Sequence, residues 1–414
     1  MFERDKEIII IGAGLSGLTA ARVLKSAGRK VKLIEASDGI GGRVRTDEID
    51  GYLLDRGFQV LLTAYPETKR FLDYKSLNLR SFLPGAMILN EKGCSEIGDP
   101  LRNPSLLFKT ITSPAGTFAD KMRMMSLKLK LSATSIDKIF NKSETTTIAY
   151  LHHLGFSQKI IDQFFKPFMS GIFLENQLHT SSRMFEYVFK LFSEDDTAVP
   201  ARGMGMIPKQ LAQVLEDDEI ILNEKVVHID GTNVITNSGR AYEADQVLIA
   251  TEATHMPMPF HRPAAPKNSV TNIYFTADKA PFTKPFIALN AIPNQLVNNV
   301  AVMNQISPYY APEDKALISV SIIRDVNGLR SAELISKVMA ELQQWFPDCI
   351  SWKHLKTYYI PYALPKDEHV ENDIAAAALK LRDNVFICGD HLLNGSINAA
   401  MRSGRLAAEA ILSQ

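Results

Sequence analysis

EIIIIGAGLSGL, residues 7–18, is the stretch that decides the fold of this 414-residue chain. The four isoleucines from Ile8 to Ile11 form an apolar, β-branched run, which is typical of a parallel strand covered on both faces. Apolar residues then recur at helical spacing from Leu18 to Ala27, and Gly28 ends the pattern. A strand, a tight glycine turn and a helix in this order predict the first βα unit of a dinucleotide-binding sheet.

Each glycine of the turn has its own task. Gly12 permits the turn, Gly14 lets the backbone approach a pyrophosphate, and Gly17 lets the helix pack closely on the strand. The N-terminus of the helix, where Ser16 lies, faces the phosphate charge. We therefore place Gly12, Gly14, Ser16 and Gly17 in a cofactor site.

A carboxylate follows the second predicted strand, Lys30 to Ile34. This residue, Glu35, lies 23 positions after Gly12, which meets the offset of about 20 residues for an acid that binds the adenosine ribose. Its carboxylate would accept hydrogen bonds from the ribose hydroxyls. The motif is therefore more specific than its glycines alone.

The segment GGRVRT, residues 41–46, distinguishes between dinucleotides. It resembles the G-G-R-x-x-[ST] segment of the flavin amine oxidase and phytoene desaturase superfamily, which also contains protoporphyrinogen oxidase-like enzymes. The resemblance implies FAD as the cofactor. Gly42 would let the backbone come close to FAD, and Arg43 offers a planar donor fork to the pyrophosphate oxygens.

Three more segments resemble motifs of this superfamily, in family order. Asp55-Arg56-Gly57 resembles the D-x-G segment that passes the flavin ring, although Asp55 is equally well explained as a turn cap. The loop at residues 200–208 resembles a glycine-rich family loop, with Arg202 where many members have glycine. By the same resemblance, the backbone of Val226 would meet the adenine edge.

The closing motif lies near the C-terminus. There Gly389 and Asp390 resemble the family's G-[DE] pair, and Asp390 would bind hydroxyls of the ribityl chain or groups near the phosphates. A helix that starts near Ile397 would aim its N–H groups at the pyrimidine end of the flavin. Flavin amine oxidases commonly place an aromatic residue in this motif, where the present chain has Ser396.

The resemblance implies an FAD-dependent oxidoreductase, and three hypotheses follow. The first is an enzyme of the desaturase or isomerase branch that takes hydride from an apolar, isoprenoid-like or carotenoid-like substrate onto flavin N5. The second is a flavin amine oxidase that releases hydrogen peroxide, which Ser396 makes less favoured. The third is a structural or regulatory FAD-binding protein without turnover. No cysteine lies in a segment that matches a covalent flavin link, so we expect noncovalent FAD, and we assign no catalytic side chain.

We expect an α/β protein with an α+β second domain. A Rossmann-like FAD-binding domain of the glutathione reductase type is interleaved with a substrate domain of mixed sheet plus a helical insertion. The predicted FAD-binding parts are residues 1–85, 200–253 and 381–414. Residues 86–199 are predicted to form a helical substrate-facing or lipid-facing subdomain, and residues 254–380 the substrate-domain sheet.

Composition excludes several classes of protein. The 46 basic and 46 acidic residues balance, so no overall field attracts nucleic acid. The three cysteines are far apart and form no C-x-x-C pair, and no metal site is indicated. A charged N-terminus without an apolar signal core leads us to expect a cytoplasmic protein. Oligomeric state is left open.

One stretch departs from this balance. Residues 102–142 contain eight basic and two acidic residues, interleaved with methionine and leucine. One interpretation is a basic amphipathic surface that contacts the periphery of a membrane and admits an apolar substrate. The other is a solvated helix face over a core stripe, which the partly alternating spacing of the apolar residues favours.

Overall fold

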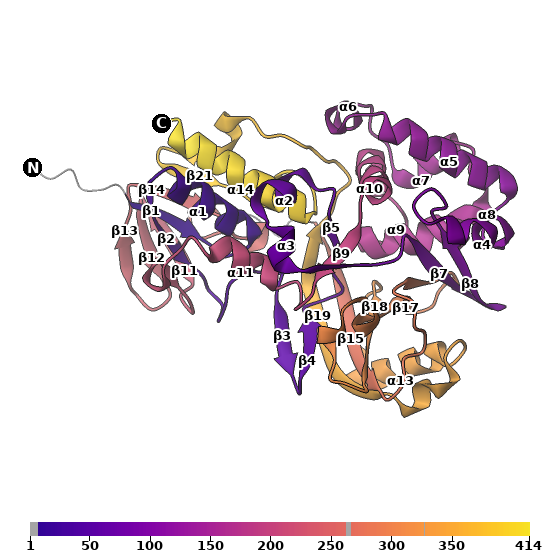
Figure 1. The fold of residues 1–414 in the computed structure, drawn as a ribbon. Helices are drawn as coiled ribbons and strands as arrows, with labels where there is room; N and C mark the ends of the chain where they lie inside the picture. The colour runs from indigo at the N-terminus through magenta and orange to yellow at the C-terminus, as the bar shows by residue number, and fades with distance from the viewer. Residues whose placement is uncertain (1–6, 262–265, 327) are drawn as a thin grey trace, which may run out of the picture.

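The computed structural model describes residues 7–261, 266–326 and 328–414 (Figure 1). Its first layer is a six-stranded sheet that takes strands from both ends of the chain. Five of these strands are parallel, and the edge strand β20 is antiparallel. In spatial order they are β10 (Ile220–Ile221), β2 (Lys30–Ile34), β1 (Glu7–Ile11), β14 (Gln246–Ile249), β21 (Val385–Ile387) and β20 (Lys380–Arg382).

Both faces of β1 are buried, as its isoleucine run predicts. Ile8 and Ile10 belong to the main core, on the side of helices α1 (Leu15–Ser26) and α14 (Ile397–Leu412). Ile9 and Ile11 pack instead with the small antiparallel sheet on the opposite face. Its strands are β11 (Val226–Asp230), β12 (Asn233–Thr236) and β13 (Ala241–Glu243).

The second large layer is a mostly antiparallel sheet of seven strands, below the helical region in Figure 1. Helix α13 (Ser331–Leu342) covers one face through Leu334, Val338 and Leu342. In spatial order the strands are β19 (Lys353–Pro365), β15 (Lys267–Ala277), β18 (Ala316–Ile322), β17 (Val297–Val302), β16 (Ile287–Asn290), β7 (Gly85–Asn90) and β8 (Gly93–Gly98).

The residues between the strand pair β7–β8 and strand β9 (Thr197–Pro200) are mostly helical, and they lie at the upper right of Figure 1. We predicted that the helical subdomain begins at residue 86, but residues 85–98 form the hairpin β7–β8 and extend the seven-stranded sheet. The division of the chain into domains stays a prediction. The helices are α4 (Leu107–Thr112), α5 (Phe118–Ser132), α6 (Ile136–Phe140), α7 (Thr147–His153), α8 (Gln158–Ile160), α9 (Lys166–Phe173) and α10 (Ser182–Glu194), with a π-helical turn at Ile161–Phe165.

Small elements join the six-stranded sheet, the seven-stranded sheet and the helical region. The hairpin β3 (Thr46–Ile49) and β4 (Tyr52–Asp55) leads from the nucleotide sheet toward the seven-stranded sheet, as Figure 1 shows. The other connecting elements are β5 (Leu61–Leu62), β6 (Leu79–Ser81), β9 (Thr197–Pro200), α2 (Pro66–Phe71), α3 (Tyr74–Leu77), α11 (Met206–Ala212) and α12 (Met303–Ile306).

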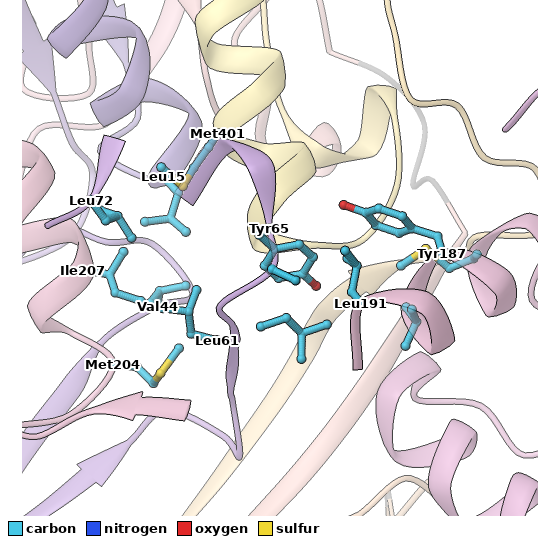
Figure 2. Close-up of a cluster of buried hydrophobic side chains, with 14 of the residues drawn as sticks. Leu15, Val44, Leu61, Tyr65, Leu72, Tyr187, Leu191, Met204, Ile207 and Met401 are labelled. Atoms are coloured by element: carbon cyan, nitrogen blue, oxygen red, sulfur yellow. The ribbon is translucent and has the colours of Figure 1, made fainter. Parts of the chain in front are cut away.

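One buried cluster runs through the molecule. Figure 2 shows it from Leu15 and Met401 on the nucleotide side, across Leu61 and Tyr65, to Tyr187 on α10. The helical region is therefore packed onto the nucleotide fold by a shared core, which limits their relative movement. No helix of the described residues is long and apolar enough to cross a bilayer.

Candidate functional site

The glycine turn lies where the sequence places it, between β1 and α1. Gly12 has a φ of +107°, and a Cβ there would approach the Ala250 carbonyl oxygen to 2.8 Å. A Cβ at Gly17 would come within 2.1 Å of the Gly12 oxygen, so only glycine lets α1 pack this closely on the turn. A Cβ at Gly14 would meet no protein atom within 4 Å and would point into open space.

The N-terminus of α1 is open to an anion. Gly14 is its N-cap residue, and no side chain caps the helix. The first N–H groups of a helix have no partner within it and carry its partial positive charge. The chain thus offers backbone donors at the place where the sequence predicts a pyrophosphate.

Glu35 is held firmly at the end of β2. Its Oε2 accepts a hydrogen bond from the Ala13 N–H at 2.7 Å. Its Oε1 accepts from the Ser37 N–H at 2.9 Å and from Ser37 Oγ at 2.7 Å. These donors join the carboxylate to the glycine turn and orient it beside the phosphate site.

Arg43 and Asp390, which the sequence places in separate motifs, form an ion pair. Arg43 Nη2 donates to Asp390 Oδ2 at 2.7 Å, and Arg43 Nη1 donates to the Ala363 carbonyl at 2.7 Å. Burial would lower the pKa of Arg43, but the Asp390 carboxylate outweighs it and the pKa is raised. The guanidinium also lies 5.3 Å from the centre of the Tyr362 ring. Both terminal nitrogens of the Arg43 guanidinium are thus already engaged, one by Asp390 and one by Ala363. The contact of Arg43 with the pyrophosphate stays a prediction.

The other predicted residues occupy turns and element ends. Gly42 has a φ of +57°, and its added Cβ would lie 3.3 Å from Gly14 Cα. Gly57 faces Ile360, whose Cδ1 would meet a Cβ at 2.8 Å. Val226 begins β11. Gly389 precedes a short turn, and Ile397 begins α14, whose N-cap Ser396 accepts the Ala399 N–H at 3.0 Å.

A cavity of about 1120 Å³ brings these residues together. Gly17 is the one predicted residue outside its wall, in keeping with its packing task. The predicted residues in the wall are Gly12, Gly14, Ser16, Glu35, Gly42, Arg43, Gly57, Val226, Gly389, Asp390 and Ile397. Because they come from the first, middle and last parts of the chain, the fold assembles the site from distant segments.

The cavity continues beyond the nucleotide fold into the helical region. Its wall there is formed mainly by large apolar side chains of α4, α5, α9 and α10, with α9 and α10 supplying Phe168, Ile172, Met184, Val188 and Phe189. Two aromatic pairs tighten this part: Phe168 packs edge-on against Phe192 at 5.2 Å, and Phe164 stacks on Phe168 at 5.5 Å.

The charged side chains in this part of the wall are already engaged by other protein groups. Arg102 pairs with Asp196, and Lys128 with Asp99. Lys121 donates to the backbone carbonyls of Ile111 and Ser113, and burial lowers its pKa. The helical end of the cavity is therefore an apolar chamber whose charged side chains are held by ion pairs or, for Lys121, by backbone carbonyls.

Two buried carboxyls lie near the site: Asp367, which the sequence did not single out, and Asp55, which it left open between a flavin contact and a turn cap. Asp367 accepts the Gly395 N–H at 2.7 Å beside the start of α14, and burial raises its pKa to about 7. Asp55 is fully buried, and burial raises its pKa to about 6. Asp55 does not line the cavity, whereas its neighbours Arg56 and Gly57 do. No local sequence signal marks a carboxyl that tertiary packing buries.

Comparison with known proteins adds a family. Residues 15–412 match the model of the family described as flavin containing amine oxidoreductase. Protoporphyrinogen oxidase 2, chloroplastic/mitochondrial, of Arabidopsis thaliana is 28% identical over 166 residues, which are 40% of this chain and 32% of that protein. An L-amino-acid oxidase of Pseudechis australis is 28% identical over 242 residues, 54% of this chain and 45% of that protein.

A solved structure of an oxidoreductase from Methanosarcina mazei has the same fold. It superposes with a TM-score of 0.75 at 17% identity, and the match covers 99% of this chain and 100% of that one. The two curated relatives are matched over less than half of their own length. The comparisons therefore show the fold and the family, and the substrate has to be argued from the site.

Proposed function

Because the chain belongs to the family of flavin-containing amine oxidoreductases, we propose that it oxidises an apolar small molecule with FAD as the hydride acceptor. The cofactor is FAD, and the proposal concerns the reaction and the substrate. The substrate would lie in the apolar chamber, next to the nucleotide half of the same cavity.

The residues present fit FAD. Open space above Gly14 and the uncapped N-terminus of α1 suit a pyrophosphate, and Glu35 lies beside them for a ribose. The cavity, at about 1120 Å³, exceeds the range of about 300–1,000 Å³ that is usual for one small ligand. It thus has room for a large cofactor and a substrate together. None of its wall residues is a cysteine, which supports noncovalent binding.

When bound, FAD supplies the electron chemistry, which is acceptance of a hydride. The chain contributes binding and shape. Glu35 and the glycine turn hold the nucleotide end, and Arg43 with Asp390 ties β21 to the segment after β2. The aromatic and aliphatic side chains of the chamber exclude water and orient the C–H bond of the substrate.

The paired charges of the chamber are the observation that carries the proposal. An amino-acid substrate needs a free cation for its carboxylate, and a polyamine needs a free carboxylate. At the helical end, Arg102, Lys128 and Asp99 are engaged in ion pairs, and Lys121 already donates to two backbone carbonyls. A neutral, apolar substrate is therefore the chemical class that this wall fits without breaking any of these contacts.

Amine oxidation is the second candidate, and the L-amino-acid oxidase relative favours it. In its disfavour, Ser396 stands where flavin amine oxidases commonly carry an aromatic residue. Ser396 lines the cavity, but its hydroxyl already caps α14.

The test is anaerobic reduction of the bound flavin. We expect an isoprenoid hydrocarbon such as phytoene, dispersed in detergent, to bleach the visible absorption of the purified flavoprotein, because hydride transfer removes the oxidised chromophore. Putrescine and a set of L-amino acids serve as matched probes. Bleaching by an amine, with hydrogen peroxide after air is admitted, would establish the second candidate instead. A flavin that every probe leaves oxidised would contradict turnover of these classes and favour a structural role.

A further inference from the structure

The outer surface of α4 and α5 is unusually apolar. Thirteen large hydrophobic side chains are exposed among the described residues, and seven of them lie between Leu101 and Leu129. We call this group the mouth surface. It consists of Leu101, Leu107, Phe108, Ile111, Phe118, Met122 and Leu129, together with the half-buried Met125. Phe108 is the most exposed of them at 76%. A cluster of this kind on one face marks an interaction site.

Helix α5 explains the alternating pattern that favoured a plain core stripe. At 3.6 residues per turn, Phe118, Met122, Met125 and Leu129 share one face. The buried residues Leu127 and Leu131 share the opposite face with Met124. The spacing alternates because both faces are apolar, and one of them looks outward. The helix thus has an apolar face that no described residue covers.

The mouth surface is also the rim of the cavity. Five of its members line the cavity wall while remaining at the molecular surface: Leu107, Ile111, Phe118, Met122 and Met125. The apolar chamber is therefore continuous with the apolar exterior. Beside this entrance Lys128 and Asp99 neutralise each other, and Lys121 donates to the backbone carbonyls of Ile111 and Ser113.

Basic residues flank the outward apolar face of α5 on both sides, but several basic residues of this stretch are engaged in ion pairs. Four of the eight pair with acids outside the stretch: Arg102 with Asp196, Lys109 with Glu96, Lys128 with Asp99 and Lys142 with Glu186. On the helical wheel, Lys121 lies on one side of the outward face, and Arg123 and Lys130 lie on the other. Lys130 forms no ion pair with any described residue.

We propose that the mouth surface docks on an anionic lipid bilayer, with its apolar side chains among the acyl chains and Lys121, Arg123 and Lys130 at the level of the phosphates. The cavity then opens directly into lipid. A protein partner or a second copy seated on the same face would cover the rim, whereas a bilayer leaves it open to apolar molecules. The inference rests on the proposed function in that the bilayer is the phase from which the apolar substrate would enter.

Vesicle flotation of the purified full-length holoprotein tests the docking. The vesicles are phosphatidylcholine, with or without about one third phosphatidylglycerol. The test variant is the double substitution Phe108→Ser and Leu129→Ser, because both side chains belong to the mouth surface and neither lines the cavity. The control is Ile350→Ser, which removes a side chain that is 75% exposed, nearly as exposed as Phe108, and that lies outside this surface.

We expect the wild type and the Ile350 variant to float with the anionic vesicles. The double variant should bind them about tenfold more weakly, while it keeps the flavin spectrum and melting temperature of the wild type. The proposal is overturned if the wild type stays with the free protein, or if the double variant binds as well as the wild type. It is also overturned if the wild type self-associates through this face, which sedimentation that depends on concentration and on Phe108 would reveal.

The two proposals fail separately. Vesicle binding needs no turnover. Docking without flavin bleaching by any apolar probe would therefore support the docking surface and contradict the apolar substrate. Bleaching by detergent-dispersed phytoene without vesicle binding would support the apolar substrate and contradict the docking surface.

Discussion

Asp55, at the end of β4, acts as a structural link between three segments. Its Oδ1 accepts hydrogen bonds from Thr46 Oγ1 at 2.5 Å and from the Met204 N–H at 2.9 Å, and its Oδ2 accepts from the Tyr310 hydroxyl at 2.7 Å. The sequence left Asp55 evenly between a flavin contact and a turn cap. Its links to Met204 and Tyr310 make it instead an anchor for the loop after β9 and for the seven-stranded sheet.

Asp55 should make stability depend on pH. Burial raises its pKa in the folded state to about 6 from an ordinary value of 3.8. Between these values the unfolded chain loses a proton that the folded chain keeps. The free energy of unfolding therefore falls as pH rises from about 4 to about 6, by about 3 kcal/mol. We expect Asp55→Asn to remove this component, as measured by urea unfolding of both proteins across the window.

The exposed Asp314→Asn provides the control, because its side chain is in solvent. Parallel stability profiles for Asp55→Asn and the wild type between pH 4 and pH 6 would contradict the assignment.

Motif residues could be placed from sequence because their tasks are local. A turn, a helix start and a strand-end acid follow one another along the chain, so the places of Gly12, Gly14 and Glu35 in the fold could be predicted from spacing alone, while their contacts with the cofactor stay predictions. The ion pair of Arg43 with Asp390 could not be predicted in this way, since 347 positions separate its partners. Contacts of this kind depend on strand order, which local patterns do not encode.

The spacing of apolar residues predicts helices and strands best where the element has one apolar face or is buried throughout. Strands β1 and β2 have the predicted limits. The exposed face of helix α5 could not be recognised from the sequence, because two opposite apolar faces give an alternating pattern that resembles a strand or a core stripe. The hairpin β7–β8 was assigned to the wrong layer, because its pairing with β16 lies about 200 residues further along the chain.

The contact of β1, the glycine turn and α1 allows cofactor binding and packing to be separated. In Gly14→Ala the new methyl group would enter the space predicted for the pyrophosphate without touching protein. We expect at least about tenfold weaker FAD binding, with the stability of the FAD-free protein lowered by at most about 1 kcal/mol. FAD fluorescence titration and urea unfolding measure the two effects.

The companion substitution Gly17→Ala should behave differently. Its methyl group would lie 2.1 Å from the Gly12 oxygen, so α1 has to move from the strand. We expect the FAD-free protein to lose about 3 kcal/mol. Equal stability of the two FAD-free variants would show that Gly17 has no packing task.

For the whole molecule, the site is shared by segments that lie far apart in sequence. The cavity wall includes the glycine turn, β11 and the start of α14, which belong to the three predicted FAD-binding parts. The sequence predicts this interleaving from the order of its motifs. It does not predict how the seven-stranded sheet and the helices close around the chamber, because that packing involves apolar residues without a motif.

FAD should stabilise the whole chain because it binds only the folded arrangement. At a free FAD concentration about 100 times Kd, we expect a gain of about 2.7 kcal/mol in the free energy of unfolding. Differential scanning fluorimetry of the protein before and after removal of FAD measures this as a higher Tm for the holoprotein. An unchanged Tm would mean that the cofactor does not bridge these segments.

The pairing of β1 with both β2 and β14, and of β14 with β21, also sets an order in time. As the chain leaves the ribosome, its glycine turn is exposed long before its partners at residues 385–397 have been synthesised. The half-built sheet keeps one open edge at β1 until residue 246 is made, and the site lacks Asp390 and α14 until residues 390–412 follow. Full capture of the cofactor therefore has to wait for this segment of the site, and a chain that stops before residue 385 cannot retain it.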